Sequence, residues 1–504
     1  MNRTLKKVAL SAMLAASSLQ AAEDDLQTHH LMLLGGGVSI CTTHSADSCL
    51  DAASLASVMA TKGNEQVLLQ QTKDPFSRAL MPAFVQKAAA ISGREQPRVL
   101  LVTASSANPF GAVDFYLQLF EQAGAHVEWL PIHAAYQQAQ RLGAELGCSQ
   151  LDDLFAKYHG LENPFGRYPE LMAYQQDVCL GGHDHTVAMI EAADAIFFNG
   201  GDQSRTLQAL RSEDGKATPE LQAIQRGLAA GRLLVGGTSA GTAVMSGSES
   251  EGIPMITNGE SRHALAFGAH ATAAPERDCD EAGTCPEGLY AASLTYHPPG
   301  GAALFPWGIL DTHFSERGRE GRLIQLALAT ATRFGFGVDE ATALLVSKPA
   351  SQSDEVRFEV LGKGGVFIAD LASAQQHRQD SNLTIDAVTT HYLTHGDRAL
   401  LRDGELSIQF ADWKQAVSET HAEPLLMDQV LQQDHFKQLA HLLCISDQPY
   451  ARGQDQFATT EFSLQLSRSE QSNSKQGQVL KDNQVFSFCS YQHLVLTLSA
   501  TVNP

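Results

Sequence analysis

The sequence has few cations for its length: 35 lysine and arginine residues stand against 56 aspartate and glutamate residues, and the net charge is −21. A phosphate backbone repels a chain with this charge, so the balance argues against nucleic acid as a partner. Beyond the N-terminal stretch, no apolar run approaches the ~18 residues that a membrane span needs. These absences favour a globular protein without a membrane span, whose ligand is not a nucleic acid.

Sequence patterns for nucleotide binding and thiol chemistry are also missing. The chain contains no Cys-x-x-Cys pair, which argues against a zinc knuckle or a thiol-redox site. The glycine triplet at 35–37 has neither the spacing of a Walker loop nor that of a dinucleotide-binding loop. His183 and His185, with one aspartate between them, are too few ligands to predict a metal site. We therefore expect no cofactor and no metal.

The first residues have the pattern of a secretory signal peptide. Three cations lie among residues 1–7, an apolar run covers 8–16, and small residues lead to a cleavage edge at Ala21 or Ala22. A buried N-terminal helix is the alternative interpretation. We interpret residues 1–22 as a signal peptide and expect a secreted protein, either extracellular or periplasmic.

The eight cysteines agree with an oxidising compartment, because their number is even and disulfides persist outside the cytoplasm. Their connectivity cannot be deduced from spacing, and pairing between neighbours is the simplest arrangement. Buried free thiols are the alternative. The neighbour pairs are Cys41–Cys49, Cys148–Cys179, Cys279–Cys285 and Cys444–Cys489.

Short apolar runs that lead into glycine turns and helical patterns recur along most of the chain. This alternation predicts βαβ units in a largely parallel sheet. Ligands of such sheets bind beyond the carboxyl ends of the strands, where the motifs described below occur. The runs cover residues 31–34, 98–103, 127–132, 195–199 and 233–236.

Changes in the apolar periodicity divide the chain into a main part and an appendage. Stretches near 38–92 and 135–185 interrupt the alternation and are interpreted as insertions. Toward the C-terminus, an apolar helical pattern leads to Cys444 and period-two alternation follows it. We expect residues 23–404 to form the main, motif-bearing domain and residues 405–504 to form a small, separable α+β appendage.

The pattern Gly-x-Ser-x-Gly occurs at 237–241, with Ser239 at its centre. An apolar run at 233–235 precedes it and a segment able to begin a helix follows, which is the context of a nucleophile elbow. Small neighbours let the serine occupy a tight turn, and the Ala240 N–H can then donate to an oxyanion. A structural glycine turn is the alternative.

A nucleophilic serine needs a base, and the base needs an acid that orients it. His313, which follows an apolar run at 307–310, is the candidate base. Glu340 ends another strand-like run and is the candidate acid, with the neighbouring Asp339 as the alternative. The chain order Ser, His, Glu differs from that of most α/β-hydrolases and argues against a lipase or esterase.

Two further groups of residues are candidates for binding substrate. Arginine forks bind carboxylates in a bidentate manner, so three arginines close to His313 predict a wall that recognises carboxylates; a solvated helix face is the alternative. The glycine turn after residue 199 offers backbone N–H groups to an oxyanion and an amide side chain to a substrate. These residues are Arg317, Arg319 and Arg322 beside His313, and Gly201 and Gln203 in the turn.

Four blocks of the sequence resemble the signature blocks of the cyanophycinases, a family of serine peptidases that also contains aspartyl dipeptidase. The block around His313 is the most specific, and the resemblance covers about 31–37 and 95–400. The blocks are NGGDQ at 199–203, GGTSAG at 236–241, DTHFSERGREGRL at 311–323 and GFGVDE at 335–340, and the segment at 98–110 is similar too.

The resemblance implies a flavodoxin-like, largely parallel sheet with helices on both faces, and a triad of Ser239, His313 and Glu340. It also implies that the substrate is cyanophycin, an aspartate backbone that carries arginine through isopeptide links, and that cleavage releases β-aspartyl-arginine. Thr312 departs from the family's commoner glutamine and puts one pocket contact in doubt. The implied pocket contains Gln203, Asp311, Thr312, Arg317, Arg319 and Arg322.

Other interpretations stay open at this point. The same site would suit an acyl hydrolase of short aspartyl peptides, similar to aspartyl dipeptidase. A binding protein that has kept the pocket without catalysis is a second alternative, against which the joint presence of Ser239, His313 and Glu340 counts. Many members of the family are dimeric, so a homodimer is open as well.

Overall fold

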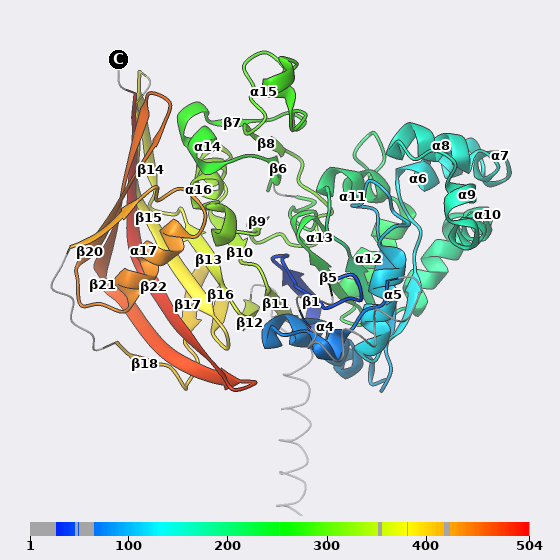
Figure 1. Ribbon diagram of the computed structural model, residues 1–504, viewed down its shortest axis with the longest axis horizontal. Helices are drawn as coiled ribbons and strands as arrows, with labels where there is room; N and C mark the ends of the chain where they lie inside the picture. The colour runs from blue at the N-terminus through cyan, green and yellow to red at the C-terminus, as the bar shows by residue number, and fades with distance from the viewer. Residues whose placement is uncertain are drawn as a thin grey trace, which may run out of the picture.

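The computed structural model describes residues 27–45, 49, 65–250, 252–350, 355–380, 382–417 and 424–502. The predicted signal peptide at 1–22 lies outside the described residues. Two large sheets lie beside each other, with helices around the first and helices α16 (Glu320–Ala329) and α17 (His435–Cys444) against the second (Figure 1). Within the described ranges, no helix is both long and apolar enough to span a bilayer.

The first sheet has nine strands and is half parallel. Neighbours from β1 to β3 in the spatial order pair in parallel, whereas those from β1 to β17 pair antiparallel. The inner parallel strands β2, β4 and β5 are mainly buried apolar runs, as expected for strands covered on both faces, whereas the edge strand β3 is partly exposed. The α/β class is therefore confirmed, with an antiparallel half that the sequence did not reveal. The order is β17 (Glu405–Gln409), β16 (Arg398–Arg402), β12 (Glu355–Gly362), β11 (Thr342–Pro349), β1 (Gln27–Leu34), β5 (Leu234–Thr238), β4 (Ala195–Phe198), β2 (Arg98–Val102) and β3 (His126–Trp129).

The second sheet is mainly antiparallel, but the two strands at each end, β9 with β10 and β19 with β20, pair in parallel. Two long strands, β21 and β22, alternate buried and exposed residues, so one face packs on a core and the other faces solvent. The order is β19 (Leu425–Asp428), β20 (Tyr450–Phe457), β21 (Thr460–Lys481), β22 (Gln484–Val502), β15 (Asn382–Thr394), β13 (Gly365–Asp370), β10 (Phe334–Val338) and β9 (Ile309–Thr312), with β14 (Gln375–Gln379) on β15 and β18 (Gln415–Ala416) on β21.

The helices and a small third sheet fill the remaining structure. Helices α6 to α10, which lie in the predicted insertion at 135–185, gather at the end of the molecule beyond the parallel strands (Figure 1). The third sheet contains β6 (Met255–Asn258), β8 (Leu294–His297) and β7 (Ala269–His270). The helices are η1 (Leu69–Gln71), α4 (Pro75–Ser92), α5 (Val113–Gln122), α6 (Ala134–Leu142), α7 (Ala144–Cys148), α8 (Leu151–His159), α9 (Pro164–Arg167), α10 (Pro169–Ala192), α11 (Gln203–Leu210), α12 (Pro219–Ala229), α13 (Ala240–Ala243), α14 (Ser261–Phe267), α15 (Cys279–Ala282), η2 (Ser315–Arg317), α16 (Glu320–Ala329) and α17 (His435–Cys444).

Strand pairing and core packing continue across residue 404, where the periodicity of the sequence changes. Strand β22 pairs along β15, and the β16–β17 hairpin crosses the expected boundary. One apolar core contains Phe314 from the main part together with Phe436 and Leu494 from the C-terminal part. The C-terminal residues contain both helix and strands, and they complete a sheet and a core that begin before residue 404. The separability of this part stays a prediction.

Four disulfides join the eight cysteines, and each pairs the neighbours that the sequence analysis selected: Cys41–Cys49, Cys148–Cys179, Cys279–Cys285 and Cys444–Cys489. Cys444 ends α17 and Cys489 lies in β22, so the last bond ties this helix to the second sheet. The helix buries Phe436, Leu439 and Leu443 along one stripe against that sheet.

A chain that ends at residue 404 should not reach the native fold. Its truncation would leave β15 without β22 and would expose the apolar face that α17 covers, so we expect aggregation or no cooperative unfolding. Thermal unfolding followed by near-ultraviolet circular dichroism, with a chain ending at 502 as the control, measures this. A native spectrum and a sharp transition in the shorter chain would restore the separable appendage.

Replacing Cys444 and Cys489 together by serine should lower the free energy of unfolding by about 4 kcal/mol, because the bond closes a loop between residues 45 apart. The matched control is the Cys279→Ser and Cys285→Ser double variant, whose bond spans 6 residues and should cost about 2 kcal/mol. Denaturant unfolding of both variants measures the difference. A larger loss for the short loop would contradict the expectation.

Candidate active site

Ser239 lies on a strained turn between β5 and α13. Strand β5 ends at Thr238, and Ser239 has a φ of 54° and a ψ of −118°, a backbone conformation that side chains other than glycine rarely adopt. Its N–H donates to the carbonyl of Leu34 at 3.1 Å, which ties the turn to the end of β1. Strain held in place by neighbouring strands is typical of a nucleophile elbow.

Steric contacts require glycine at both flanking positions of the Gly-x-Ser-x-Gly pattern. A Cβ atom on Gly237 would collide with the carbonyl oxygen of Gly241, and one on Gly241 would collide with that of Phe198. This turn can therefore form only when residues 237 and 241 have no side chain. The alternative of an ordinary glycine turn does not account for the strained residue at its centre.

The serine of the first sheet meets two side chains from the second sheet. Ser239 Oγ lies 2.8 Å from His313 Nε2, and His313 Nδ1 lies 2.6 Å from Glu340 Oε1. His313 follows β9, whereas Glu340 lies two residues beyond the end of β10, and these two strands are parallel neighbours. The arrangement brings together the three residues that the sequence analysis selected as nucleophile, base and orienting acid.

The glycine triplet after β1 makes room for this contact. The His313 N–H donates to the carbonyl of Gly35 at 2.7 Å. A Cβ atom on Gly36 would collide with the imidazole of His313, and one on Gly37 would collide with the carboxylate of Glu340. This role of the triplet was not predicted from the sequence, although its position at the end of a buried strand was the available signal.

The surroundings of His313 favour its neutral form. Burial lowers the pKa of His313 most strongly, the hydrogen bond to Glu340 raises it, and the positive charges of Arg317 and Arg319 lower it again. The net shift is downward, so the imidazole is uncharged at neutral pH. A neutral imidazole can accept a proton from a neighbouring hydroxyl.

Asp339, the alternative orienting acid, does not contact His313. Its carboxylate is fully buried and accepts the N–H groups of Ser315 at 3.1 Å and Gly365 at 3.2 Å. The ammonium group of Lys437 lies 2.9 Å from Asp339 Oδ2, the oxygen that also accepts from Gly365. Between the two neighbouring acids, the geometry therefore favours Glu340 as the partner of the imidazole.

The two candidate oxyanion donors lie in different surroundings. Ala240 follows Ser239 directly and is buried at the start of α13. In the second glycine turn, Gly200 lies next to Ser239, because a Cβ atom on it would be 3.3 Å from the Cβ of Ser239. Gly201 has a φ of 146° and packs on the backbone of Ser105.

Three of the predicted pocket residues bind one another. Arg322 Nε donates to Asp311 Oδ2 at 2.8 Å, and Arg319 Nη1 donates to Asp311 Oδ1 at 3.3 Å. Burial alone would raise the pKa of Asp311, but the charges of Arg322 and Arg319 outweigh it and lower the pKa. Protein arginines therefore occupy both carboxylate oxygens of Asp311.

Two other predicted pocket residues are engaged by the protein. Gln203 Nε2 donates to the carbonyls of Ile256 at 2.7 Å and Thr257 at 3.3 Å, which anchors the start of α11 to β6. Thr312 is buried, its N–H donates to Asp311, and its carbonyl accepts from Arg319. Both residues shape the wall of the site through these bonds.

An arginine-rich groove of about 960 Å³ lies beside these residues. Arg262 and Arg277 join the three predicted arginines there, and Glu260 is the single acid among the described residues that line it. Burial and the charge of Arg322 lower the pKa of Arg319 to about 9, so the groove still holds mainly charged guanidinium groups at neutral pH. The sequence analysis missed Arg262 and Arg277 because no motif surrounds them. The lining residues are Asn258, Gly259, Glu260, Ser261, Arg262, Arg277, Ala291, Ala292, Arg317, Arg319, Arg322, Gln429, Leu431, Gln432, Gln433 and His435.

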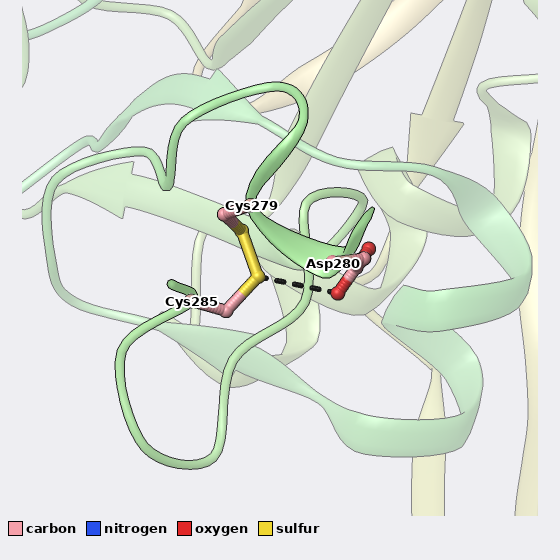
Figure 2. Close-up of side chains that lie close together, drawn as sticks. All are labelled: Cys279, Asp280 and Cys285. Carbon is pink, nitrogen blue, oxygen red and sulfur yellow. Dashed lines mark hydrogen bonds between the residues drawn. A yellow bond between two sulfur atoms is a disulfide. The ribbon is translucent and has the colours of Figure 1, made fainter. Parts of the chain in front are cut away.

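One group of metal-type ligands occurs within the described ranges, and it consists of Cys279, Asp280 and Cys285 (Figure 2). The two sulfur atoms are bonded to each other, so neither is a thiolate that could bind a metal. His183 Nδ1 instead lies 2.7 Å from Glu220 Oε1, so this histidine has a protein partner.

The fold and the site define a mixed α/β protein with a hydrogen-bonded serine, histidine and glutamate at strand ends. No family model matches the chain. It is 32% identical over 216 residues to the cyanophycinases of Trichormus variabilis and Nostoc sp., a match that covers 42% of this chain and 58% of each relative. The cyanophycinase of Geminocystis herdmanii is 31% identical over 214 residues, or 42% of this chain and 63% of the relative.

The chain therefore spans about three fifths of the length of the curated relatives it matches. These matches confirm the resemblance of this chain to cyanophycinases. A solved peptidase from an acI-B1 Actinobacterium aligns over 74% of this chain and 97% of its own, with 16% identity and a TM-score of 0.35. Similarity at that level indicates neither a shared fold nor a shared function.

Replacing Arg317 by glutamine should raise the pKa of His313, because the loss of a nearby cation favours the protonated imidazole. NMR titration of the imidazole in the full chain measures this pKa. Arg398→Gln removes an exposed cation that is not among the charges acting on His313 and is the control. An unchanged or lowered pKa in the Arg317 variant would contradict the electrostatic account of the site.

Proposed function

We propose that this protein is a secreted serine peptidase that hydrolyses cyanophycin to β-aspartyl-arginine dipeptides. The observation that carries the proposal is the unbroken chain of hydrogen-bond contacts from Ser239 through His313 to Glu340. The similarity to curated cyanophycinases supports the substrate class.

In the proposed reaction, Ser239 Oγ attacks the carbonyl carbon of the scissile bond while His313 Nε2 takes its proton. Glu340 stabilises the imidazolium that forms. The negative charge on the carbonyl oxygen of the tetrahedral intermediate is held by backbone N–H groups, for which Ala240 and Gly201 are the candidates. Collapse of the intermediate breaks the C–N bond, and the imidazolium donates its proton to the leaving amine.

Water then completes the cycle. It attacks the acyl-enzyme carbonyl and gives a proton to His313, and the second tetrahedral intermediate releases the carboxylic acid product and restores the Ser239 hydroxyl. Every proton and electron pair is thereby accounted for by the serine, the imidazole and one water molecule.

Carboxylate recognition is the proposed role of the arginine groove. Each unit of cyanophycin carries a carboxylate on its arginine, and the guanidinium groups that line the groove offer paired donors to such a group. Arg317 is exposed, so it is free to reach a substrate, while the buried Arg322 is bound to Asp311 and shapes the wall. The groove thus supplies cationic surface in a chain whose net charge is −21.

Secretion is supported by two independent features. The N-terminal residues have the pattern of a signal peptide, and the eight cysteines form disulfides, which persist in oxidising compartments. We infer that the protein degrades polymer outside the cytoplasm.

Incubation of the purified protein with cyanophycin should release β-aspartyl-arginine, identified by mass spectrometry. Ser239→Ala should lower the turnover number by about 10⁴-fold or more, and adding His313→Ala should cost little further, because residues of a triad act as a unit. Glu340→Gln should be less severe, since it mainly disturbs the tautomer and the stabilisation of the imidazolium. Chelators should leave the rate unchanged.

Ser149→Ala, an exposed serine between α7 and α8, is the control and should keep the wild-type rate. A folded Ser239→Ala protein with near wild-type turnover would exclude the serine mechanism. Hydrolysis of short aspartyl peptides without cleavage of the polymer would favour the dipeptidase alternative, and binding of cyanophycin without any products would favour a binding protein.

A further inference from the structure

A cation from the C-terminal part of the chain lies behind the Ser239–His313–Glu340 triad. Lys437, on α17, places its ammonium nitrogen 2.9 Å from Asp339 Oδ2 and 3.7 Å from Glu316 Oε1. The carboxylate of Asp339 is fully buried, and 29% of the lysine side chain is exposed. No motif in the sequence connects this lysine with residues about 100 positions earlier.

Asp339 and Glu316 hold the two segments that carry the base and its orienting acid. Asp339 precedes Glu340 directly, and its carboxylate accepts the N–H of Ser315, which is two residues beyond His313. Glu316 Oε2 accepts the N–H of Glu340 at 3.1 Å. Two neighbouring carboxylates thus fix the backbone on both sides of the His313–Glu340 hydrogen bond.

These carboxylates need a cation, because buried like charges repel each other and are costly without a partner. Burial raises the pKa of Glu316 to about 7, repulsion from Asp339 adds to the rise, and Lys437 opposes it. Burial likewise raises the pKa of Asp339, but Lys437 and the Tyr392 hydroxyl reverse the shift and keep it ionised. Asp434, Glu320 and Tyr491 are further titratable groups that act on this cluster.

Aromatic packing fixes the helix that carries Lys437. Phe436, its neighbour, packs edge-on against Phe367 of β13 at 5.7 Å between ring centroids. Phe367 stacks on Phe314 at 5.3 Å, and Phe314 follows His313 directly. The same helix therefore touches the base segment through a ring stack and the acid segment through an ion pair.

We propose that Lys437 is a positioning residue for the triad, and that the C-terminal part of the chain thereby completes the active site. The lysine neutralises Asp339 and Glu316. The hydrogen bonds from the backbone of Ser315 and Glu340 to these carboxylates then keep the imidazole of His313 and the carboxylate of Glu340 within hydrogen-bond distance of each other. This inference rests on the proposed function, because it assigns a role within that triad.

The test compares Lys437→Met with Lys437→Arg in the full chain on a short, soluble oligomer of β-aspartyl-arginine units. Lys437→Met should lower kcat at least tenfold and change KM less than threefold, since the lysine touches the triad supports and not the arginine groove. Lys437→Arg keeps the cation and should recover kcat to within threefold of wild type.

Lys414→Met is the matched control. Lys414 also lies in the C-terminal part, is fully buried, and contacts the buried Asp397 at 2.7 Å. It is expected to lower the melting temperature while the folded protein keeps kcat within twofold. An equal loss of kcat in this variant would mean that any buried lysine of the region has the effect, and would overturn the specific role of Lys437.

The remaining outcomes separate this inference from the proposed function. If Ser239→Ala is inactive but folded Lys437→Met keeps kcat within twofold of wild type, the positioning role is wrong and the triad stands. If Ser239→Ala is active, the proposed function itself fails. If Lys437→Met does not fold, Lys437→Gln replaces it. The proton between His313 and Glu340 should then lose its NMR signal. An unshifted signal would overturn the inference.

Discussion

The geometry of the site depends on the close approach of the backbone at Gly35–Gly37 to His313 and Glu340. Strand β1 belongs to the first sheet, and the segment after it accepts the N–H of His313 from the second sheet. Side chains at Gly36 and Gly37 would occupy the space of the imidazole and the carboxylate. The two sheets can therefore bring Ser239, His313 and Glu340 together only where one strand end carries no side chains.

This constraint explains why strain is concentrated at the site. Ser239 and His313 both have positive φ angles, which for residues with side chains require support from their surroundings. Ser239 has that support from the carbonyl of Leu34, and His313 from the carbonyl of Gly35. The same edge of β1 thus holds the proposed nucleophile and the proposed base in conformations that neither would adopt alone.

Charge is distributed around the site in two layers. The described residues that line the groove include five arginines and one glutamate, so that its surface suits carboxylates. Next to His313 and Glu340 in the chain, the buried Asp339 and the partly buried Glu316 are acids that pair with Lys437. The lowered pKa of His313 belongs to this arrangement, because burial and the arginines act against its protonation more strongly than Glu340 favours it.

Local pattern was sufficient to predict several parts of this protein. The run before Ser239, the glycines around it and the blocks around His313 and Glu340 depend on near neighbours in the chain, so the sequence predicted the strand–turn contexts that the structure contains. The α/β class was predicted from the same local alternation of apolar runs and turns, whereas the cysteine pairing was the simplest of many arrangements. The roles of the triad residues remain predictions that kinetics must test.

Long-range packing decided what the sequence alone could not. Strand β22 joins β15 across the expected boundary at residue 404, and no periodicity in either strand specifies its partner. Arg277 enters the groove and Lys437 reaches Asp339 because helices and loops distant in sequence fold onto the same strand ends. Such contacts are set by how whole elements bury their apolar faces, which is a property of the tertiary structure.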